Sequence, residues 1–94
     1  MKIWLDDLRP APKGWLWCKS VTEAQIALRS GAVENLSLDH DLGNQDDGDG
    51  IKLVLWLCEA EKFWPRSRPT VHSRNPVGRE NMLALIQRYG PYEE

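Results

Sequence analysis

Two spacings of hydrophobic residues alternate along this chain. Short apolar runs, typical of buried strands, are interleaved with longer segments in which apolar residues recur every three or four positions, as on one face of a helix. The predicted strands are Lys2–Leu5, Trp15–Cys18, Asn35–Leu38 and Pro69–Ser73. Because strands alternate with helices, we expect an α/β fold with a parallel sheet of four strands covered by helices.

The first and last predicted helices have recognisable ends. Ser20 and Glu23 form a capping box, in which the hydroxyl and the carboxylate satisfy free N–H groups at a helix start. Gly31 is typical of the residue that follows a helix. Asn75 is a favourable N-cap, and Pro76 suits the first helical position.

The middle helix, predicted over Ile51–Phe63, is apolar on two sides. Such a helix is buried on most sides or meets a partner. We call Leu53, Trp56 and Leu57 the second stripe of this helix. If the domain leaves that stripe exposed, it would mark an interface, so we expect a homodimer through residues 51–63.

The length and charge of the chain limit what it can be. Its 94 residues suit one domain over residues 1–94. The formal net charge is −2 and no basic run occurs, which argues against strong sequence-independent binding along a nucleic-acid backbone. An enzyme that grips a single terminal phosphate remains compatible with this charge.

The cysteines and the N-terminus indicate a compartment. Cys18 and Cys58 lack the spacing of a zinc site, and we expect both to be buried thiols in a reducing environment. Asp6 and Asp7 come too early for a signal peptide, and no apolar run reaches the ~20 residues that cross a bilayer. We therefore expect a cytoplasmic protein without a membrane partner.

Chemically able side chains follow three of the predicted strands. Ligands of an open parallel sheet bind outside the carboxyl ends of its strands, so groups distant in sequence converge there. These groups are Asp6 and Asp7, then Asp39, His40 and Asp41, then His72, Ser73, Arg74 and Asn75.

The acids in this set predict a cation site. Asp6, Asp7 and Asp39 would repel one another, and a hard cation such as Mg²⁺ or Mn²⁺ relieves that repulsion through oxygen ligands. The alternative is that these residues only stabilise turns after strands.

The two histidines of the chain, His40 and His72, both fall at this edge. Imidazole titrates near neutral pH, so the pair could act as general acid and base. Binding a transition metal is the alternative.

The start of the last helix predicts a phosphate site. A helix N-terminus offers free N–H groups and partial positive charge, and Ser73 and Asn75 lie there. Arg9 and Arg74 could add paired hydrogen bonds to a phosphate, or could be solvated surface arginines.

Two further features have a less specific meaning. The loop Asn44–Gly50 is rich in Asp and Gly but lacks the spacing of a calcium loop, so we interpret it as a possible lid. Five tryptophans suggest stacking on nucleobases, with packing as the alternative. Trp15 and Trp17 alternate on a strand and therefore share one face.

Three motifs together resemble one family. Leu5–Pro10, Leu38–Gly43 and Val71–Gly78 are similar to motifs of the cyclic-phosphate-processing receiver-like domains, relatives of response-regulator receivers. The resemblance covers nearly the whole chain and implies a receiver-like Rossmannoid three-layer sandwich. It also implies a role on nucleotides or RNA termini that carry a 2′,3′-cyclic phosphate.

The resemblance assigns roles to individual positions. Asp6 and Asp7 match the acidic pair that holds the metal, and Asp39 matches the phosphoacceptor. Asp41 matches the position whose backbone carbonyl reaches the metal, and Ser73 matches the hydroxyl after the fourth strand. A fifth strand ending in lysine is missing, which argues against aspartyl-phosphate signalling.

We therefore expect a metal-dependent phosphoesterase-like domain. Asp6, Asp7 and Asp39 would hold the metal, while His40 and His72 would transfer protons. The alternative is a non-catalytic module that signals, sequesters a nucleotide or binds a protein.

Overall fold

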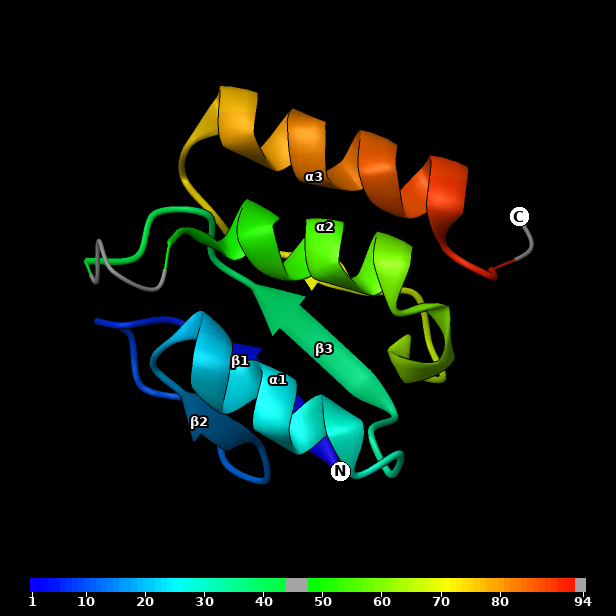
Figure 1. Cartoon of the computed structure of the whole chain (residues 1–94). Coiled ribbons are helices and arrows are strands. Elements are labelled where there is room, and N and C mark those ends of the chain that lie inside the picture. Colours follow the sequence, from blue (N-terminus) through cyan, green and yellow to red (C-terminus); the bar gives the residue numbers. More distant parts are fainter. Residues whose placement is uncertain (44–47, 93–94) are drawn as a thin grey trace.

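The computed structural model describes residues 1–43 and 48–92, and its elements follow the predicted alternation (Figure 1). The strands are β1 (Lys2–Leu5), β2 (Leu16–Cys18), β3 (Asn35–Leu38) and β4 (Thr70–Val71). The helices are α1 (Val21–Arg29), α2 (Gly50–Glu59) and α3 (Pro76–Tyr89), with a 3₁₀ turn, η1, at Glu61–Phe63. Residues 44–47 of the predicted lid lie outside the described part. The α/β class is confirmed.

All strand pairs of the sheet are parallel, in the order β2-β1-β3-β4. The register places Trp4 beside Trp17 on one side and Ser37 on the other. Leu5 is likewise flanked by Cys18 and Leu38. The carboxyl ends of the strands therefore share one edge, as expected.

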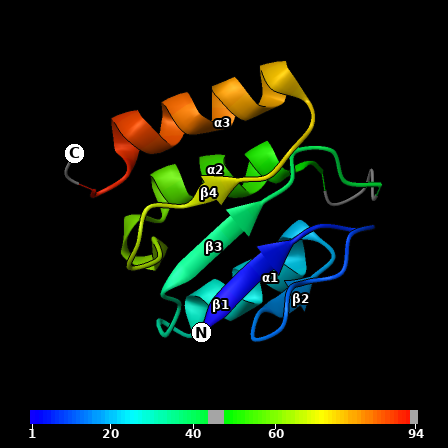
Figure 2. The same ribbon diagram turned by 180° about the vertical axis from the view of Figure 1, so that it is seen from behind.

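The helices form a single layer, so the fold has two layers and not the three that the family resemblance implied. Both helical crossovers, β2 to β3 and β3 to β4, run in the same direction across the sheet, and right-handed connections place α1 and α2 on one face. Helix α3 packs against α2. The connection from β1 to β2 runs the opposite way, but it is a loop containing Pro10 and Pro12. Figure 2 views the sheet from the side that, among the described residues, no helix covers.

The core lies between the sheet and the helical layer. Ile3, Leu5, Leu36 and Leu38 are almost fully buried on the sheet side. The helices cover them with Val21, Ala24, Leu28, Leu53, Val54, Leu57, Met82 and Ile86, which are also buried. Burial of this kind is the main favourable contribution to folding, and here it is concentrated on one face of the sheet.

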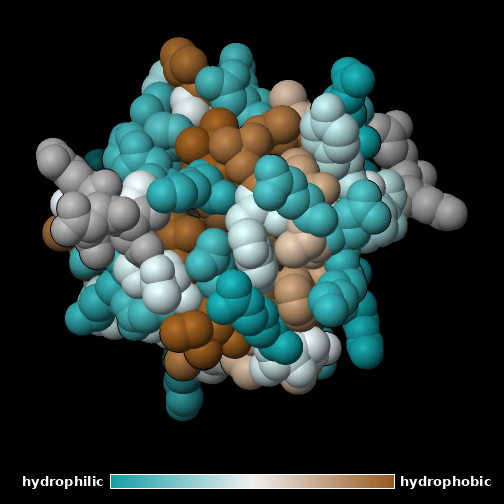
Figure 3. Space-filling view, viewed as in Figure 1, coloured by the Kyte–Doolittle hydropathy of each residue, from teal (hydrophilic) through white to brown (hydrophobic). Residues whose placement is uncertain are grey.

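The second stripe of the middle helix is not exposed, contrary to our expectation. Leu53 and Leu57 are 0% exposed, and Trp56 stacks on Phe63 with ring centroids 5.4 Å apart. Helix α2 packs against both α1 and α3, which cover its second side. On the face of Figure 3, hydrophobic side chains gather in patches that hydrophilic ones interrupt. A homodimer through residues 51–63 stays a prediction that this stripe does not support.

The predicted helix ends agree with the structure at both caps. The Ser20 hydroxyl accepts a hydrogen bond from the Glu23 N–H, and the Asn75 side chain accepts one from the Gly78 N–H. The middle helix is shorter than predicted because the backbone leaves the helical region at Ala60, with ψ of 63°.

The cysteine thiols are free, and Cys18 is buried. Burial raises the pKa of Cys18 to about 11, so this thiol stays protonated at neutral pH. Cys58 is half-buried, and burial raises its pKa as well. Within residues 1–43 and 48–92, no helix combines the length and the apolar character that a bilayer span needs.

Replacing Gly50 with alanine should destabilise the fold. A Cβ atom there would overlap the backbone oxygen of Asp39, and the Gly50 N–H donates to the His40 carbonyl at 2.8 Å. We expect Gly50→Ala to lower the free energy of unfolding by about 1–3 kcal/mol, as for other overpacked sites. Urea denaturation measures this change, with Glu59→Ala on the exposed side of α2 as control. An unfolding midpoint for Gly50→Ala equal to that of the wild type would contradict the close approach of α2 to the end of β3.

Candidate functional site

Asp6, directly after β1, is a buried charge whose hydrogen-bonding partners favour its ionised form. Its side chain is 0% exposed. One carboxylate oxygen accepts the backbone N–H groups of Leu8 and Arg9, each at 2.9 Å. The other lies 3.3 Å from Arg9 Nε and 3.1 Å from His72 Nε2. Burial alone would raise the pKa of Asp6, but the hydrogen bonds from Arg9, Leu8 and His72 outweigh it, so the pKa is lowered.

Asp39, after β3, has the opposite tendency. It is also buried, and burial together with the charge of Asp6 raises its pKa. The Ser73 hydroxyl donates to its carboxylate, which only partly offsets this effect. Two neighbouring carboxylates with opposite pKa shifts indicate that the second negative charge is poorly compensated by the protein itself.

Asp7 completes a group of three carboxylates with a buried oxygen that lacks a partner. Its Oδ2 accepts the Gly43 N–H at 2.7 Å, while Oδ1 is buried and makes no hydrogen bond to the described residues. Oxygens of Asp6, Asp7 and Asp39 lie within 4.8 Å of one another. Buried polar atoms normally have partners, and hard cations prefer such oxygens, so this group fits a divalent cation.

Arg9 lies across this group. Its Nε contacts Asp6 at 3.3 Å, its Nη2 lies 3.9 Å from Asp39, and its Nη1 donates to the His72 carbonyl at 3.4 Å. The side chain is 42% exposed, so one side of the guanidinium faces solvent. Arg9 therefore partly neutralises the carboxylates and is also open to an approaching anion.

His72, just after β4, has both ring nitrogens engaged. Nδ1 lies 2.7 Å from the Ser37 hydroxyl and Nε2 lies 3.1 Å from Asp6. Its ring stacks on Trp4 with centroids 3.8 Å apart and an interplanar angle of 4°. Burial lowers the pKa of His72 although Asp6 acts against the shift. A neutral ring held in this way orients Asp6 and leaves no free nitrogen for a substrate, contrary to our expectation for this residue.

His40 differs because, within residues 1–43 and 48–92, only its Nδ1 has a hydrogen-bond partner. Nδ1 lies 2.8 Å from the Asp41 carboxylate, which also accepts from the Asn75 amide at 3.2 Å. These hydrogen bonds, first that of His40 and then that of Asn75, lower the pKa of Asp41. The ring packs against α3, since a Cβ on Gly78 would overlap it. The Asp41 carboxylate therefore joins His40, not the group of Asp6, Asp7 and Asp39.

Of the residues predicted to bind phosphate after β4, two have contacts at the start of α3 and one does not. Ser73 and Asn75 lie at the start of α3, where the Ser73 hydroxyl accepts the Asn75 N–H at 3.1 Å. The Asn75 side chain caps the helix at Gly78 and contacts Asp41, so it joins the helix start to the histidine. Arg74 is exposed, and no contact of its side chain with the described residues indicates a role in the site.

The sequence did not reveal three contributors to this site. Ser37 orients His72, Gly43 holds Asp7 through its N–H, and Asp49 lies in a group with His40 and Asp41. A polar residue inside the apolar run 35–38 was the one available signal for Ser37. The other two depend on loop conformation, which local sequence patterns do not specify.

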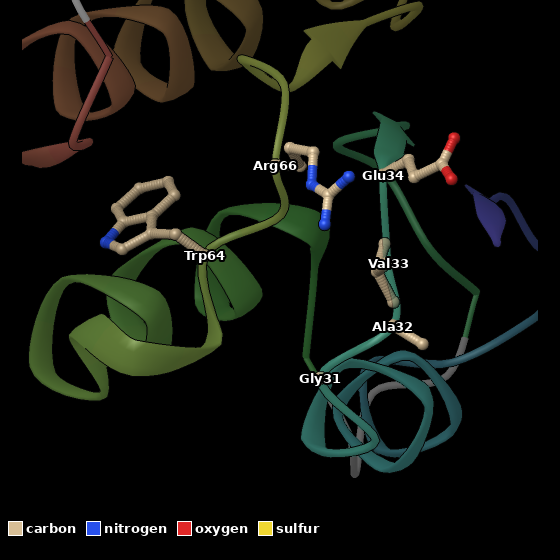
Figure 4. Close-up of a pocket in the computed structure, with 6 residues that line it drawn as sticks. All are labelled: Gly31, Ala32, Val33, Glu34, Trp64 and Arg66. Carbon is tan, nitrogen blue, oxygen red and sulfur yellow. The ribbon is translucent and has the colours of Figure 1, made fainter.

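A pocket of about 370 Å³ lies elsewhere, just before β3 begins. Figure 4 shows the residues that line it. They are Gly31, Ala32, Val33, Glu34, Trp64 and Arg66. No residue of the predicted site lines this pocket, so the chemistry is concentrated at the opposite, carboxyl edge of the sheet.

A comparison with protein-family models shows which family this domain belongs to. Residues 1–88 match the model described as the cyclic-phosphate processing receiver domain. The chain belongs to this family. Searches of curated proteins and of solved structures found no match.

Membership in the cyclic-phosphate processing receiver family confirms the resemblance that the three motifs indicated. The match spans every described strand and nearly all of α3, so it includes each residue of the candidate site. The family description connects the domain with cyclic-phosphate processing. It does not specify a reaction, a metal or a substrate.

We expect Mg²⁺ to stabilise the protein through the three carboxylates. A ligand that binds only the folded state adds about 2.7 kcal/mol of stability at a concentration 100 times its Kd. Asp39→Asn should abolish the Mg²⁺-dependent rise in melting temperature, whereas Glu59→Gln, with the same change in charge on the exposed side of α2, should retain it. Equal Mg²⁺ effects in both variants would contradict the site.

Without metal, Asp39→Asn should be more stable than the wild type at neutral pH. The pKa of Asp39 is raised above its ordinary 3.8 on folding, so its ionised form destabilises the native state. The advantage of Asp39→Asn should shrink as pH falls through the raised pKa toward 3.8. Urea denaturation across this pH range, in the presence of a chelator, measures the free energy of unfolding of both proteins. A difference between them that does not depend on pH would contradict the assigned pKa shift.

Proposed function

We propose that this domain hydrolyses a 2′,3′-cyclic phosphate on a nucleotide or RNA terminus in a metal-dependent reaction. The observation that carries the proposal is the buried oxygen of Asp7, which has no hydrogen-bond partner among the described residues and belongs to the group with Asp6 and Asp39. His40 lies at the same edge of the sheet, with its Nδ1 paired with Asp41. Phosphoryl transfer needs mainly positioning and charge neutralisation, and both are supported by these groups.

Asp6, Asp7 and Asp39 would hold Mg²⁺ or Mn²⁺. Such an ion, when bound, neutralises charge on phosphoryl oxygens and lowers the pKa of bound water. The buried Asp6 is kept ionised by its hydrogen bonds, so it is ready to serve as a ligand without losing a proton. His72 keeps this carboxylate in place from the side of β4.

His40 is the proposed acid–base residue. Because Nδ1 is paired with Asp41, the other nitrogen, Nε2, is the one that can exchange a proton with an attacking or leaving oxygen. The Asp41 carboxylate fixes the orientation of the ring, and the Asn75 amide fixes Asp41 in turn. His40 therefore has the support expected of a positioned general acid or base.

The phosphoryl oxygens would bind between Arg9 and the start of α3. Arg9 offers the solvent-facing side of its guanidinium, whose fork geometry matches phosphate oxygens. The N-terminus of α3 adds partial positive charge beside Ser73 and Asn75.

Turnover of a 2′,3′-cyclic mononucleotide in the presence of Mg²⁺ tests the proposal. His40→Gln should reduce kcat about 10²–10⁴-fold, the usual contribution of general acid–base catalysis. His72→Gln should mainly raise the Mg²⁺ concentration needed for activity, because it loosens Asp6. Glu80→Gln, on the exposed surface of α3, is the control and should behave as wild type.

The outcomes separate the two functional classes. Wild-type protein that binds the cyclic nucleotide but never turns it over would reject hydrolysis and favour a sequestering module. Full activity of His40→Gln would remove this residue from the mechanism. Loss of activity in Glu80→Gln would show that the assay reports stability and not chemistry.

A further inference from the structure

The sheet face that the helices leave open carries a row of aromatic rings. Trp4 and Trp17 are neighbours in the register of β1 and β2, and Trp15 comes just before β2. The Trp15 ring meets the Trp4 ring edge to face at 6.1 Å, and Trp4 stacks on His72. All four side chains are partly exposed. We call Trp4, Trp15, Trp17 and His72 the aromatic face.

Two lysine ammonium groups lie close to the rings of this aromatic face. The Lys2 ammonium lies 5.7 Å from the centre of the Trp15 ring, and the Lys19 ammonium lies 4.3 Å from that of Trp17. Lys2 and Lys19 are exposed, so their charges remain available to solvent ligands. Rings beside ammonium groups suit a ligand that has both flat bases and phosphates, and they suit an acidic or apolar protein surface less well.

The aromatic face is continuous with the carboxylate group. The Trp17 indole donates to the Asp6 carbonyl at 2.6 Å, and the Trp4 indole donates to the Arg9 carbonyl at 3.0 Å. His72 connects the aromatic face with the carboxylate group, because its ring stacks on Trp4 while its Nε2 contacts Asp6. A nucleotide whose phosphate lies beside Arg9 would therefore have its neighbouring bases close to these rings.

We propose that the aromatic face stacks the nucleobases next to the cyclic phosphate, so that the preferred substrate is a single-stranded RNA end. This inference rests on the proposed function of the carboxylate site and names its substrate class. Stacking on an aromatic side chain typically changes Kd about 5- to 150-fold per base and tolerates any base sequence. The net charge of −2 is compatible with this, because the contacts are few and local.

Trp15 is the residue that tests the aromatic face. The indoles of Trp4 and Trp17 hydrogen-bond the loop that carries Asp6, so replacing them would disturb the carboxylates. The ring of Trp15 instead meets the Trp4 ring and the Lys2 ammonium. The variants are Trp15→Leu, Trp15→Phe, which keeps a ring, and Trp56→Leu on the helical side as control.

Two probes are compared. One is a ribotrinucleotide that ends in a 2′,3′-cyclic phosphate, and the other is the same trinucleotide without its first two bases. Calorimetry with Mg²⁺ gives both Kd values in a His40→Gln background, which suppresses turnover. We expect the protein to bind the complete trinucleotide at least about 5-fold more tightly than the abasic trinucleotide. Trp15→Leu should lose most of this preference, while Trp15→Phe and Trp56→Leu should retain it.

Equal affinities for the two chains, or a preference that Trp15→Leu leaves unchanged, would overturn the inference. Dimers in light scattering that Trp15→Leu dissociates would also overturn it, since a second copy would then occupy the face. A base preference without any turnover by the wild-type protein would overturn the proposed function alone. Turnover without a base preference would overturn the inference alone.

Discussion

Asp6 is an ionised carboxylate without exposed surface, and the chain around it has to compensate that charge. Two backbone N–H groups of the following loop, the Arg9 guanidinium and His72 all approach its two oxygens. These partners come from the loop after β1 and from the end of β4, so the buried charge connects a central strand of the sheet with its edge strand. Oxygens of Asp7 and Asp39 lie within 4.8 Å of this charge, so ionisation of Asp39 has to overcome its repulsion.

The direction of the strand connections explains why one side of the sheet is different. A right-handed crossover from β1 to β2 would cover the face opposite α1 and α2, and here a loop containing Pro10 and Pro12 makes that connection. This loop supplies the N–H groups that hold Asp6 and receives the indole hydrogen bonds of Trp4 and Trp17. One segment thus organises both the charged edge and the open face of the sheet.

Features that depend on local pattern or on sheet topology could be predicted from the sequence. The caps at Ser20 and Asn75 follow from side-chain chemistry, and the group of acids follows because parallel strands end at one edge. Features that depend on packing between elements could not be predicted from the sequence. An apolar stripe such as that of α2 has the same pattern whether a neighbouring helix or a second copy covers it. The pairing of Ser37 with His72 depends on the register of β3 and β4, which no spacing along the chain reveals.

The outer strands of the sheet have a consequence for behaviour at high concentration. β2 has three residues and β4 has two, so each edge offers few backbone groups for pairing with another chain. Short edge strands are a known protection against edge-to-edge aggregation. A domain with one uncovered sheet face can therefore remain resistant to fibril-like polymerisation, because ribbon growth requires long edges and not merely an open surface.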